Sequence, residues 1–230
     1  MTRPLHAIIF DFDGVIADSE RLHLRAYQDV LSAAGLSLTD RDYFDKYLGY
    51  DDVGVFRMLA RDQAWAMDDH QLDSFVAQKS ARYDELSGSG ELLYPGAAEF
   101  IKQAAAAVPI AIASGALSHE IEEALDRAGL RDLFPVIVGA DHTSRSKPAP
   151  DPYLHAFARL QMSSGRTLDP ARTVAIEDSR WGLEAAREAG LRLVAVTNTY
   201  DASELKDAAE LVVGGLKELT LADLDRLFES

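Results

Sequence analysis

The sequence predicts an α/β protein in which a doubly wound, Rossmann-like parallel sheet carries an inserted, all-helical cap domain. Short aliphatic runs recur along the chain, and helical patterns lie between most of them. Continuous apolar strands that alternate with helices are typical of a parallel sheet covered on both faces. The cap is predicted because no strand-like run occurs between about residues 19 and 87. The expected strands are residues 7–10, 110–113, 136–139, 173–177, 193–196 and 211–213.

The inserted region begins directly after the first strand and its loop. Amphipathic helical patterns fill it, and the Ser-Gly-Ser-Gly run at 87–90 is expected to form a flexible return to the sheet. The alternating pattern restarts at Tyr94-Pro95-Gly96. We therefore expect a core domain of residues 1–17 and 92–230 and a helical cap domain of residues 18–91.

Two later segments, 119–130 and 180–191, carry helical patterns that each end in Ala-Gly-Leu. Gly129 and Gly190 occupy the position where a helix commonly ends on a left-handed residue. Both segments are thus predicted to be helices that end at these glycines.

Composition narrows the class of protein. The hydrophobic fraction of 47% and the charged fraction of 27% are ordinary for a globular protein. The absence of cysteine excludes disulfides, thiolate zinc sites and a cysteine nucleophile, and it fits a cytoplasmic protein. The N-terminal apolar run is short and soon acidic, so we expect no signal peptide.

A formal net charge of −15 bears on partners. So acidic a surface repels nucleic acid and anionic membranes, and neither is expected as a partner. An anionic substrate would need local positive charge from a metal ion, a lysine or helix N-termini. We expect a monomer.

Ligands of open parallel sheets bind beyond the carboxyl ends of the strands, so the loops there are the candidate site. In the first of these loops, Asp11 and Asp13 share a face because strand side chains alternate, while Phe12 points elsewhere. The pair is either solvated and incidental, or it holds a hard cation such as Mg²⁺ and supplies a carboxylate nucleophile.

The second loop, Ala113-Ser114-Gly115, follows a strand and precedes a helix expected to begin near Ser118. A hydroxyl and free backbone N–H groups at a helix N-terminus can hold a phosphate. The alternative is simple helix capping by Ser114 or Ser118.

The third loop places Lys147 on an extended segment, because Pro148 and Pro150 prevent a helix. Asp151 is expected as the N-cap of the next helix, with Pro152 at its first position. The ammonium of Lys147 can then reach inward, although a lysine on such a turn is usually a surface residue.

The fourth loop begins with Glu177 and Asp178 at the end of a strand. These acids can complete an oxygen cage with Asp11 and the carbonyl of Asp13. Alternatively, Asp178 or Ser179 only caps the following helix.

The motifs DFDGVIADS (11–19), ASG (113–115), SKPAPDPY (146–153) and IEDSRWG (176–182) together resemble those of the haloacid dehalogenase superfamily of phosphotransferases. The branch that contains β-phosphoglucomutase and phosphoglycolate phosphatase is the most similar. The resemblance covers nearly the whole chain, including the helical cap after the first motif.

The resemblance implies catalytic roles for four residues. Asp11 would be the nucleophile that accepts the phosphoryl group, and Asp13 the general acid and then the general base. Ser114 would hold a phosphate oxygen, and Lys147 would neutralise charge on the nucleophile and on the transferring group.

The resemblance also implies a metal site and substrate contacts. Mg²⁺ would be held by Asp178, the side chain of Asp11 and the carbonyl of Asp13, with Glu177 as a further ligand or as a residue behind the ligands. The expected substrate-binding residues are Gly115, Ala116, His23 and Lys79.

His23 and Lys79 match cap positions that, in the phosphomutase, couple cap closure to protonation of the leaving group. A histidine at this position also occurs in related phosphatases, so it does not separate the two activities. The alternative for His23 is a half-buried helix residue.

The function expected from this resemblance is that of a Mg²⁺-dependent phosphatase. It would act on a small phosphorylated metabolite, such as a sugar phosphate or phosphoglycolate, through an aspartyl-phosphate intermediate. A sugar phosphomutase is the alternative. A third is a non-catalytic protein that binds phosphorylated ligands, but the presence of Asp11, Asp13, Lys147 and Asp178 argues against it.

The expected cap position for gripping a second phosphate falls on Asp51 and Asp52, and two acids argue against the mutase. Cationic side chains elsewhere in the cap, at Lys46, Arg57 or Arg82, can compensate. A dehydrogenase is set aside, because no G-x-G-x-x-G run follows the first strand.

Overall fold

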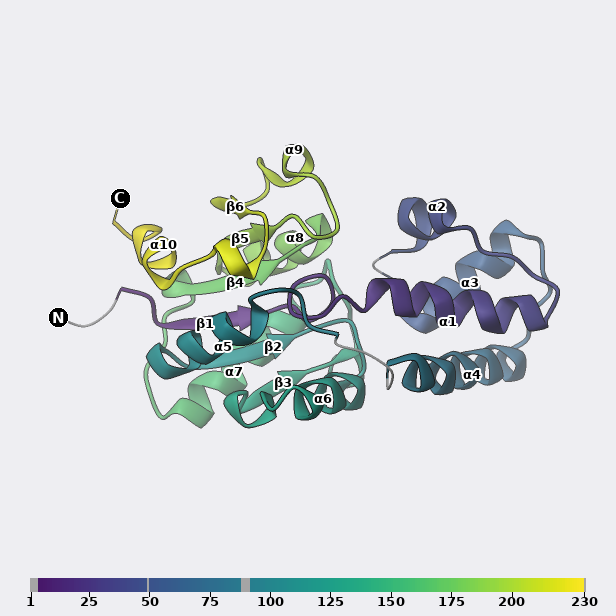
Figure 1. Cartoon of the computed structure of the whole chain (residues 1–230), viewed down its shortest axis with the longest axis horizontal. Coiled ribbons are helices and arrows are strands. Elements are labelled where there is room, and N and C mark those ends of the chain that lie inside the picture. Colours follow the sequence, from purple (N-terminus) through teal and green to yellow (C-terminus); the bar gives the residue numbers. More distant parts are fainter. Residues whose placement is uncertain (1–3, 49, 88–91, 230) are drawn as a thin grey trace. The chain divides into compact units, whose positions relative to one another are not determined.

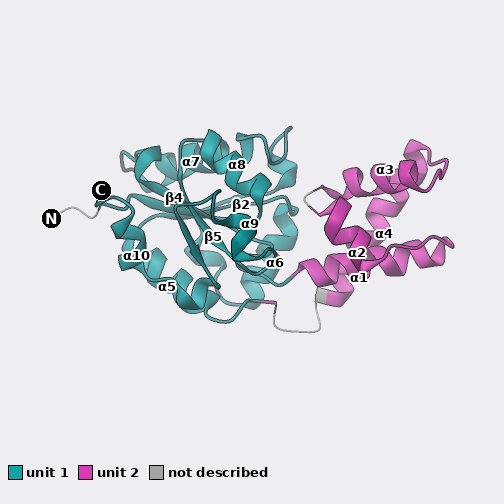
Figure 2. Cartoon of the chain, turned by 90° about the horizontal axis from the view of Figure 1, so that it is seen from above, with its two compact units in different colours: residues 1–18, 93–230 teal, residues 19–92 magenta. Residues whose placement is uncertain are grey.

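The computed structural model describes residues 4–48, 50–87 and 92–229 of the 230-residue chain. It divides into two compact units, Met1–Asp18 with Leu93–Ser230, and Ser19–Leu92 (Figure 2). Residues 88–90 of the expected flexible return lie outside the described residues. Each unit is described separately below.

The larger unit contains a single sheet of six parallel strands in the order β3-β2-β1-β4-β5-β6 (Figure 1). The order reverses between β1 and β4, which creates the topological switch of a doubly wound fold. The predicted α/β sheet is confirmed, and the strands agree with the predicted ones to within a residue at each end. They are β1 Ala7–Phe10, β2 Ile110–Ala113, β3 Val136–Val138, β4 Thr173–Glu177, β5 Arg192–Val196 and β6 Leu211–Val213.

Helices connect these strands. The α-helices are α5 Ala97–Ala107, α6 Ser118–Arg127, α7 Asp151–Ser164, α8 Arg180–Glu188, α9 Ala202–Leu205 and α10 Leu221–Arg226. Short 3₁₀ turns are η2 Arg131–Leu133, η3 Ala140–His142, η4 Pro170–Arg172 and η5 Leu216–Glu218. None of the described helices is both long and apolar enough to cross a membrane.

The helices cover both faces of the sheet, with α7 and α8 on one side and α5 and α6 on the other (Figure 2). Side chains alternate along β1 accordingly. Ile9 joins a buried cluster that includes Tyr153 of α7 and Leu183 of α8. Phe10 points to the opposite face and makes edge-to-face contacts with Phe100 and Phe134, at ring-centroid distances of 6.2 and 6.0 Å.

Local signals at the helix ends agree with the sequence in most places. Gly129 and Gly190 adopt left-handed backbone angles, with φ of 65° and 79°, as predicted. The prediction that Asp151 caps α7 is wrong, because Asp151 is already its first helical residue and Pro150 precedes it. The Asp151 carboxylate instead binds Arg145, at 3.0 Å from Nε and 2.8 Å from the terminal nitrogen.

The secondary-structure elements of the smaller unit, within its described residues, are all helices joined by short connections. Its elements are α1 Glu20–Ala33, α2 Asp40–Asp42, the π-helical turn η1 Tyr43–Tyr47, α3 Asp52–Asp62 and α4 Asp69–Ser87. Tyr27 of α1 and Phe56 of α3 are both buried and make an edge-to-face contact in its interior, with ring centroids 5.3 Å apart. Such aromatic burial supplies a core for this unit.

Replacing Phe10 by alanine should lower the free energy of unfolding by about 3–5 kcal/mol, because it empties a fully buried site between two aromatic rings. Urea denaturation measures this loss. Met162→Ala on α7, where the side chain is 82% exposed, is the matched control and should change stability by less than about 0.5 kcal/mol. Equal losses in the two variants would contradict the assigned core.

Candidate active site

The register of the strands brings several of the predicted residues to the carboxyl-terminal ends of the central strands. Phe10 of β1 pairs with Ile112 of β2 and with Ile176 of β4. Asp11, Ser114 and Glu177 therefore leave neighbouring strands at the same, carboxyl-terminal end of the sheet. This edge is where ligands bind in open parallel sheets.

Lys147 lies between two carboxylates of this edge. Its Nζ is 3.0 Å from Oδ1 of Asp11 and 2.6 Å from Oε1 of Glu177. The side chain is only 11% exposed, and Nζ lies 5.1 Å from the ring centre of Tyr153. The surface alternative for Lys147 therefore does not hold, since its charge points into the core unit and bridges two loops.

Both carboxylate oxygens of Glu177 are occupied by protein donors. Oε1 accepts hydrogen bonds from Lys147 and from the hydroxyl of Tyr153, at 2.6 and 2.9 Å. Oε2 accepts from the backbone N–H of Asp178 at 3.0 Å, and from the N–H and hydroxyl of Ser179 at 3.2 and 3.0 Å. A carboxylate offers roughly four lone-pair sites. Glu177 thus has no capacity left for a metal ion, and it holds Lys147 instead.

Charge is unevenly balanced around Asp11. Burial, followed by the charge of Glu177, raises the pKa of Asp11 well above its usual range; Asp13 adds to this and Lys147 opposes it. Burial alone would also raise the pKa of Glu177. However, the charge of Lys147 and the hydrogen bonds that the Glu177 carboxylate accepts bring that pKa below its usual value. The site therefore carries more buried carboxylate than Lys147 can compensate, which a further cation would correct.

A divalent cation fits the donor chemistry of this edge. Carboxylate oxygens of Asp11, Glu177 and Asp178 lie within 4.8 Å of one another, and all three residues are buried. Because Glu177 accepts five hydrogen bonds, Asp11 and Asp178 are the stronger candidates for metal ligands. Oxygen donors of this kind suit Mg²⁺.

Gly14 allows the first loop to approach Asp178. Its φ of +74° is in the left-handed region, and a Cβ at this position would overlap the Asp178 carboxylate and lie 2.9 Å from Oγ1 of Thr199. Only glycine satisfies both constraints. The loop that carries Asp11 and Asp13 is thereby held against the end of β4.

The second loop is partly internally bonded. Ser114 is buried, and its Oγ accepts a hydrogen bond of 3.1 Å from the backbone N–H of Ala116. That N–H, expected to face a phosphate, thus has a protein partner, while the Ser114 hydroxyl keeps its own proton to donate. A Cβ at Gly115 would meet no atom within 4 Å, so open space surrounds this position.

The two cap residues of the prediction form a pair within the helical unit. Lys79 is 1% exposed, and its Nζ lies 2.7 Å from Nδ1 of His23 and 2.8 Å from Oδ1 of Asp52. The His23 ring stacks on Tyr83 with centroids 4.1 Å apart. Both predicted residues therefore interact with each other, and His23 is buried rather than half-buried.

Three contacting residues were not singled out from the sequence. Tyr153 donates to Glu177, Thr199 donates to Oδ2 of Asp178, and Asn198 donates to the carbonyl of Gly14 at 2.8 Å. The rule that strand ends build the site applies equally to the polar run after the strand at 193–196, and it would have identified Asn198 and Thr199.

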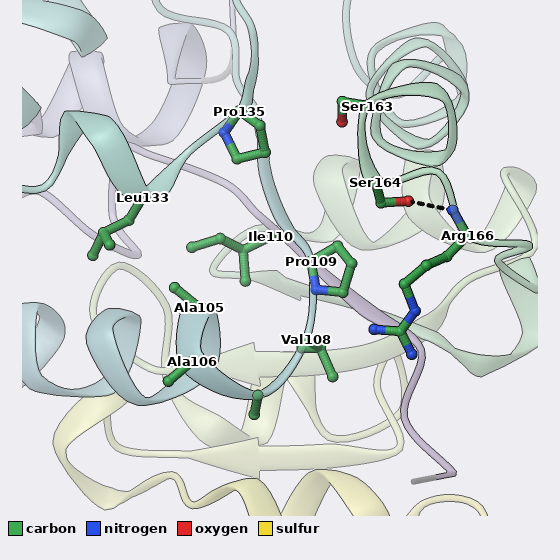
Figure 3. Close-up of a pocket in the computed structure, with 11 residues that line it drawn as sticks. Ala105, Ala106, Val108, Pro109, Ile110, Leu133, Pro135, Ser163, Ser164 and Arg166 are labelled. Carbon is green, nitrogen blue, oxygen red and sulfur yellow. Dashed lines mark hydrogen bonds between the residues drawn. The ribbon is translucent and has the colours of Figure 1, made fainter. Parts of the chain in front are cut away.

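A separate open pocket of about 410 Å³ lies near the amino-terminal ends of β2 and β3, away from the candidate site (Figure 3). It is lined by the chain that leads into β2, including Val108 and Pro109, and by Ser163 and Ser164 at the end of α7. Both serine hydroxyls donate to carbonyls of their own helix. Nothing in this pocket resembles the carboxylate and lysine cluster.

Residues 8–196 match the family model of haloacid dehalogenase-like hydrolases. The chain belongs to this family. This hydrolase is 34% identical to the protein CbbY of Rhodobacter capsulatus over 215 residues, which cover 90% of this chain and 91% of that protein. It is 32% identical to hexitol phosphatase B of Escherichia coli K12 over 225 residues, which cover 96% and 97% of the two chains.

Solved structures agree with this assignment. The hydrolase superimposes on a mutant CbbY from Rhodobacter sphaeroides in complex with xylulose-(1,5)bisphosphate, with a TM-score of 0.86, 30% identity, and coverage of 96% and 99%. β-Phosphoglucomutase from Clostridium difficile gives a TM-score of 0.86 at 21% identity, covering 98% and 97%, which shows the shared fold. The predicted family and class of enzyme, a phosphatase of this superfamily, are confirmed.

Gly14→Ala should destabilise the hydrolase more than Gly129→Ala does. Both variants place alanine in the left-handed region, at a cost of about 1 kcal/mol. A Cβ at Gly129 meets nothing within 4 Å, whereas the one at Gly14 overlaps Asp178, which typically adds another 1–3 kcal/mol. Unfolding midpoints in urea measure the difference, and equal midpoints would mean that the loop is not held against Asp178.

Proposed function

We propose that this hydrolase is a Mg²⁺-dependent phosphatase that acts on a phosphorylated sugar or sugar alcohol through an aspartyl-phosphate intermediate on Asp11. The observation that carries the proposal is the environment of the Asp11 carboxylate. Its Oδ1 is held by the backbone N–H of Phe12 at 2.7 Å and by Lys147 at 3.0 Å. Its Oδ2 accepts no hydrogen bond from the described residues, so this oxygen is the one available to attack phosphorus.

The substrate class rests on relatives. Hexitol phosphatase B is named for a phosphorylated sugar alcohol, and the CbbY mutant was solved with xylulose-(1,5)bisphosphate. Each shares at least 30% identity with this chain over more than nine-tenths of its length. A small phosphorylated carbohydrate is therefore the substrate class to test first.

The first half-reaction transfers the phosphoryl group from the substrate oxygen to Oδ2 of Asp11. Lys147 offsets the negative charge of the attacking carboxylate and of the transferring group, and the Ser114 hydroxyl donates to a phosphoryl oxygen. Phosphoryl transfer depends mainly on such positioning and charge neutralisation. Glu177 contributes by keeping Lys147 oriented toward Asp11.

Asp13 is the proposed proton donor and acceptor. It lies two residues beyond Asp11 and is half-buried at the same loop. As an acid it would protonate the departing oxygen of the substrate, and as a base it would then take a proton from the water that hydrolyses the aspartyl phosphate. The same group serves both steps, because the first leaves it deprotonated.

Mg²⁺ would be held by the carboxylates of Asp11 and Asp178 and by the backbone carbonyl of Asp13. When bound, the ion would balance the charge of the buried carboxylates and would stabilise the negative charge on the phosphoryl oxygens. Glu177 is not proposed as a ligand, because its oxygens already accept five hydrogen bonds.

The helical unit favours a phosphatase over a phosphomutase. A mutase needs a cation to hold a second phosphate, and the three cap residues considered for this role are already paired with acids. Lys46 lies 2.7 Å from Asp42, Arg57 lies 3.8 Å from Asp69, and Arg82 lies 2.9 Å from Asp29. Asp52, at the expected phosphate-gripping position, is itself an acid paired with Lys79.

Phosphate release from a panel of metabolites tests the proposal. The panel contains hexitol phosphates, hexose 6-phosphates, β-glucose 1-phosphate, pentose bisphosphates and phosphoglycolate. Asp11→Asn should lower phosphate release by about 10³-fold or more, because the amide cannot act as the nucleophile. Asp126→Asn, which alters an exposed carboxylate of α6, is the control and should retain full activity.

The same assay separates the two activities. If glucose 1-phosphate is converted to glucose 6-phosphate in the presence of a bisphosphate primer, without net release of phosphate, the chain is a mutase. Absence of both reactions from folded protein would refute the enzyme proposal.

Removing divalent cations should abolish phosphate release, because Lys147 alone cannot balance the buried carboxylates of Asp11, Glu177 and Asp178. EDTA treatment followed by titration with MgCl₂ measures this dependence. Addition of NaCl at matched ionic strength is the control and should restore nothing. Full activity in excess EDTA would contradict the proposed metal site.

A further inference from the structure

Residues 197–201 form the loop between β5 and α9. In the strand order this loop lies on one side of the β1 and β4 ends, and the loop of Lys147, which follows β3, lies on the other. Its start is tied to the sheet, because the N–H of Thr197 donates to the carbonyl of Val213 at 3.0 Å. Farther along, Tyr200 makes an edge-to-face contact with Trp181 of α8, with centroids 6.4 Å apart. The loop is thus anchored on both sides of Thr199.

Thr199 contacts a proposed metal ligand directly. Its hydroxyl donates a hydrogen bond to Oδ2 of Asp178. An ionised carboxylate only accepts hydrogen bonds, so the direction of this bond is fixed. The bond restricts rotation of the Asp178 carboxylate, whose terminal torsion is otherwise broad.

Asn198 ties the same loop to the other side of the site. Its side-chain N–H donates to the carbonyl of Gly14 at 2.8 Å. Gly14 follows Asp13, whose backbone carbonyl is another proposed ligand. Neighbouring residues of one loop therefore hold both the turn after β1 and the ligand after β4.

From these contacts we infer that Thr199 is a positioning residue for the metal, which orients the Asp178 carboxylate while Asn198 fixes the turn at Gly14. The inference rests on the proposed function and adds to it a fifth loop that no predicted motif contains. Partners that orient metal ligands typically change metal affinity by 10–100-fold when they are removed. Thr199 would act through Asp178 and not by touching the substrate.

Valine and serine separate the hydroxyl of Thr199 from its shape. Thr199→Val keeps the branched shape and removes the donor, whereas Thr199→Ser keeps the donor. Thr197→Val is the matched control, because the Thr197 hydroxyl makes no hydrogen bond to any residue that the structure describes. All three variants alter a threonine of the same loop, and two of them remove its hydroxyl.

Isothermal titration of metal-free protein with MgCl₂ is the experiment, and it reads binding without activity. Thr199→Val should weaken Mg²⁺ affinity by about 10–100-fold, while Thr199→Ser stays within about threefold of the unchanged protein. Thr197→Val should bind as the unchanged protein does. The Mg²⁺ concentration for half-maximal phosphate release should shift by the same factor as the affinity.

The outcomes distinguish this inference from the proposed function. If Thr199→Val and Thr197→Val bind Mg²⁺ equally well, the positioning role is refuted and the phosphatase proposal stands. If Thr199→Val fails to fold, the Mg²⁺ affinity of Thr199→Ser is the deciding measurement. A loss of about 10-fold or more in a variant that keeps the hydroxyl would overturn the inference. If the unchanged protein binds no Mg²⁺ and releases no phosphate, both proposals fall.

Discussion

The site depends on one buried ammonium group between two carboxylates. Lys147 is within 3.0 Å of both Asp11 and Glu177. These two acids lie at the ends of the neighbouring strands β1 and β4, and Lys147 comes from a different loop. A buried ion pair is stable only when its remaining hydrogen-bonding capacity is used. Tyr153 and Ser179 provide that for Glu177. Removing Lys147 would leave two buried, uncompensated acids, so the three loops hold one another in place.

This arrangement divides the acids by role. Glu177 is saturated with protein donors and supports Lys147, while Asp11 keeps one oxygen without a donor among the described residues. Burial, followed by the charge of neighbouring carboxylates, raises the pKa of Asp11. The excess negative charge of these carboxylates would favour binding of a divalent cation. The acidic groups that would repel a phosphate are thus also the groups that would hold the proposed cation.

The fold was predictable because buried parallel strands have continuous aliphatic sequences. The site was located because ligands bind at the loops that follow such strands. Partner choice was not predictable. Glu177 was left open between ligand and support, since its role depends on donors from Tyr153 and Ser179. Asp151 was wrongly expected to cap a helix, because its pairing with Arg145 is not visible in local sequence. Thr199 gave no motif signal of its own.

The most direct test of the account is to locate the phosphoryl group on the chain during turnover. Acid-quenched enzyme, digested and analysed by mass spectrometry, should contain a peptide that carries one phosphoryl group on Asp11, stable in acid and lost on treatment with base or hydroxylamine. The modification should be absent from Asp11→Asn. A phosphoryl group on another residue, or rapid phosphate release with Asp11 unmodified throughout, would contradict the account.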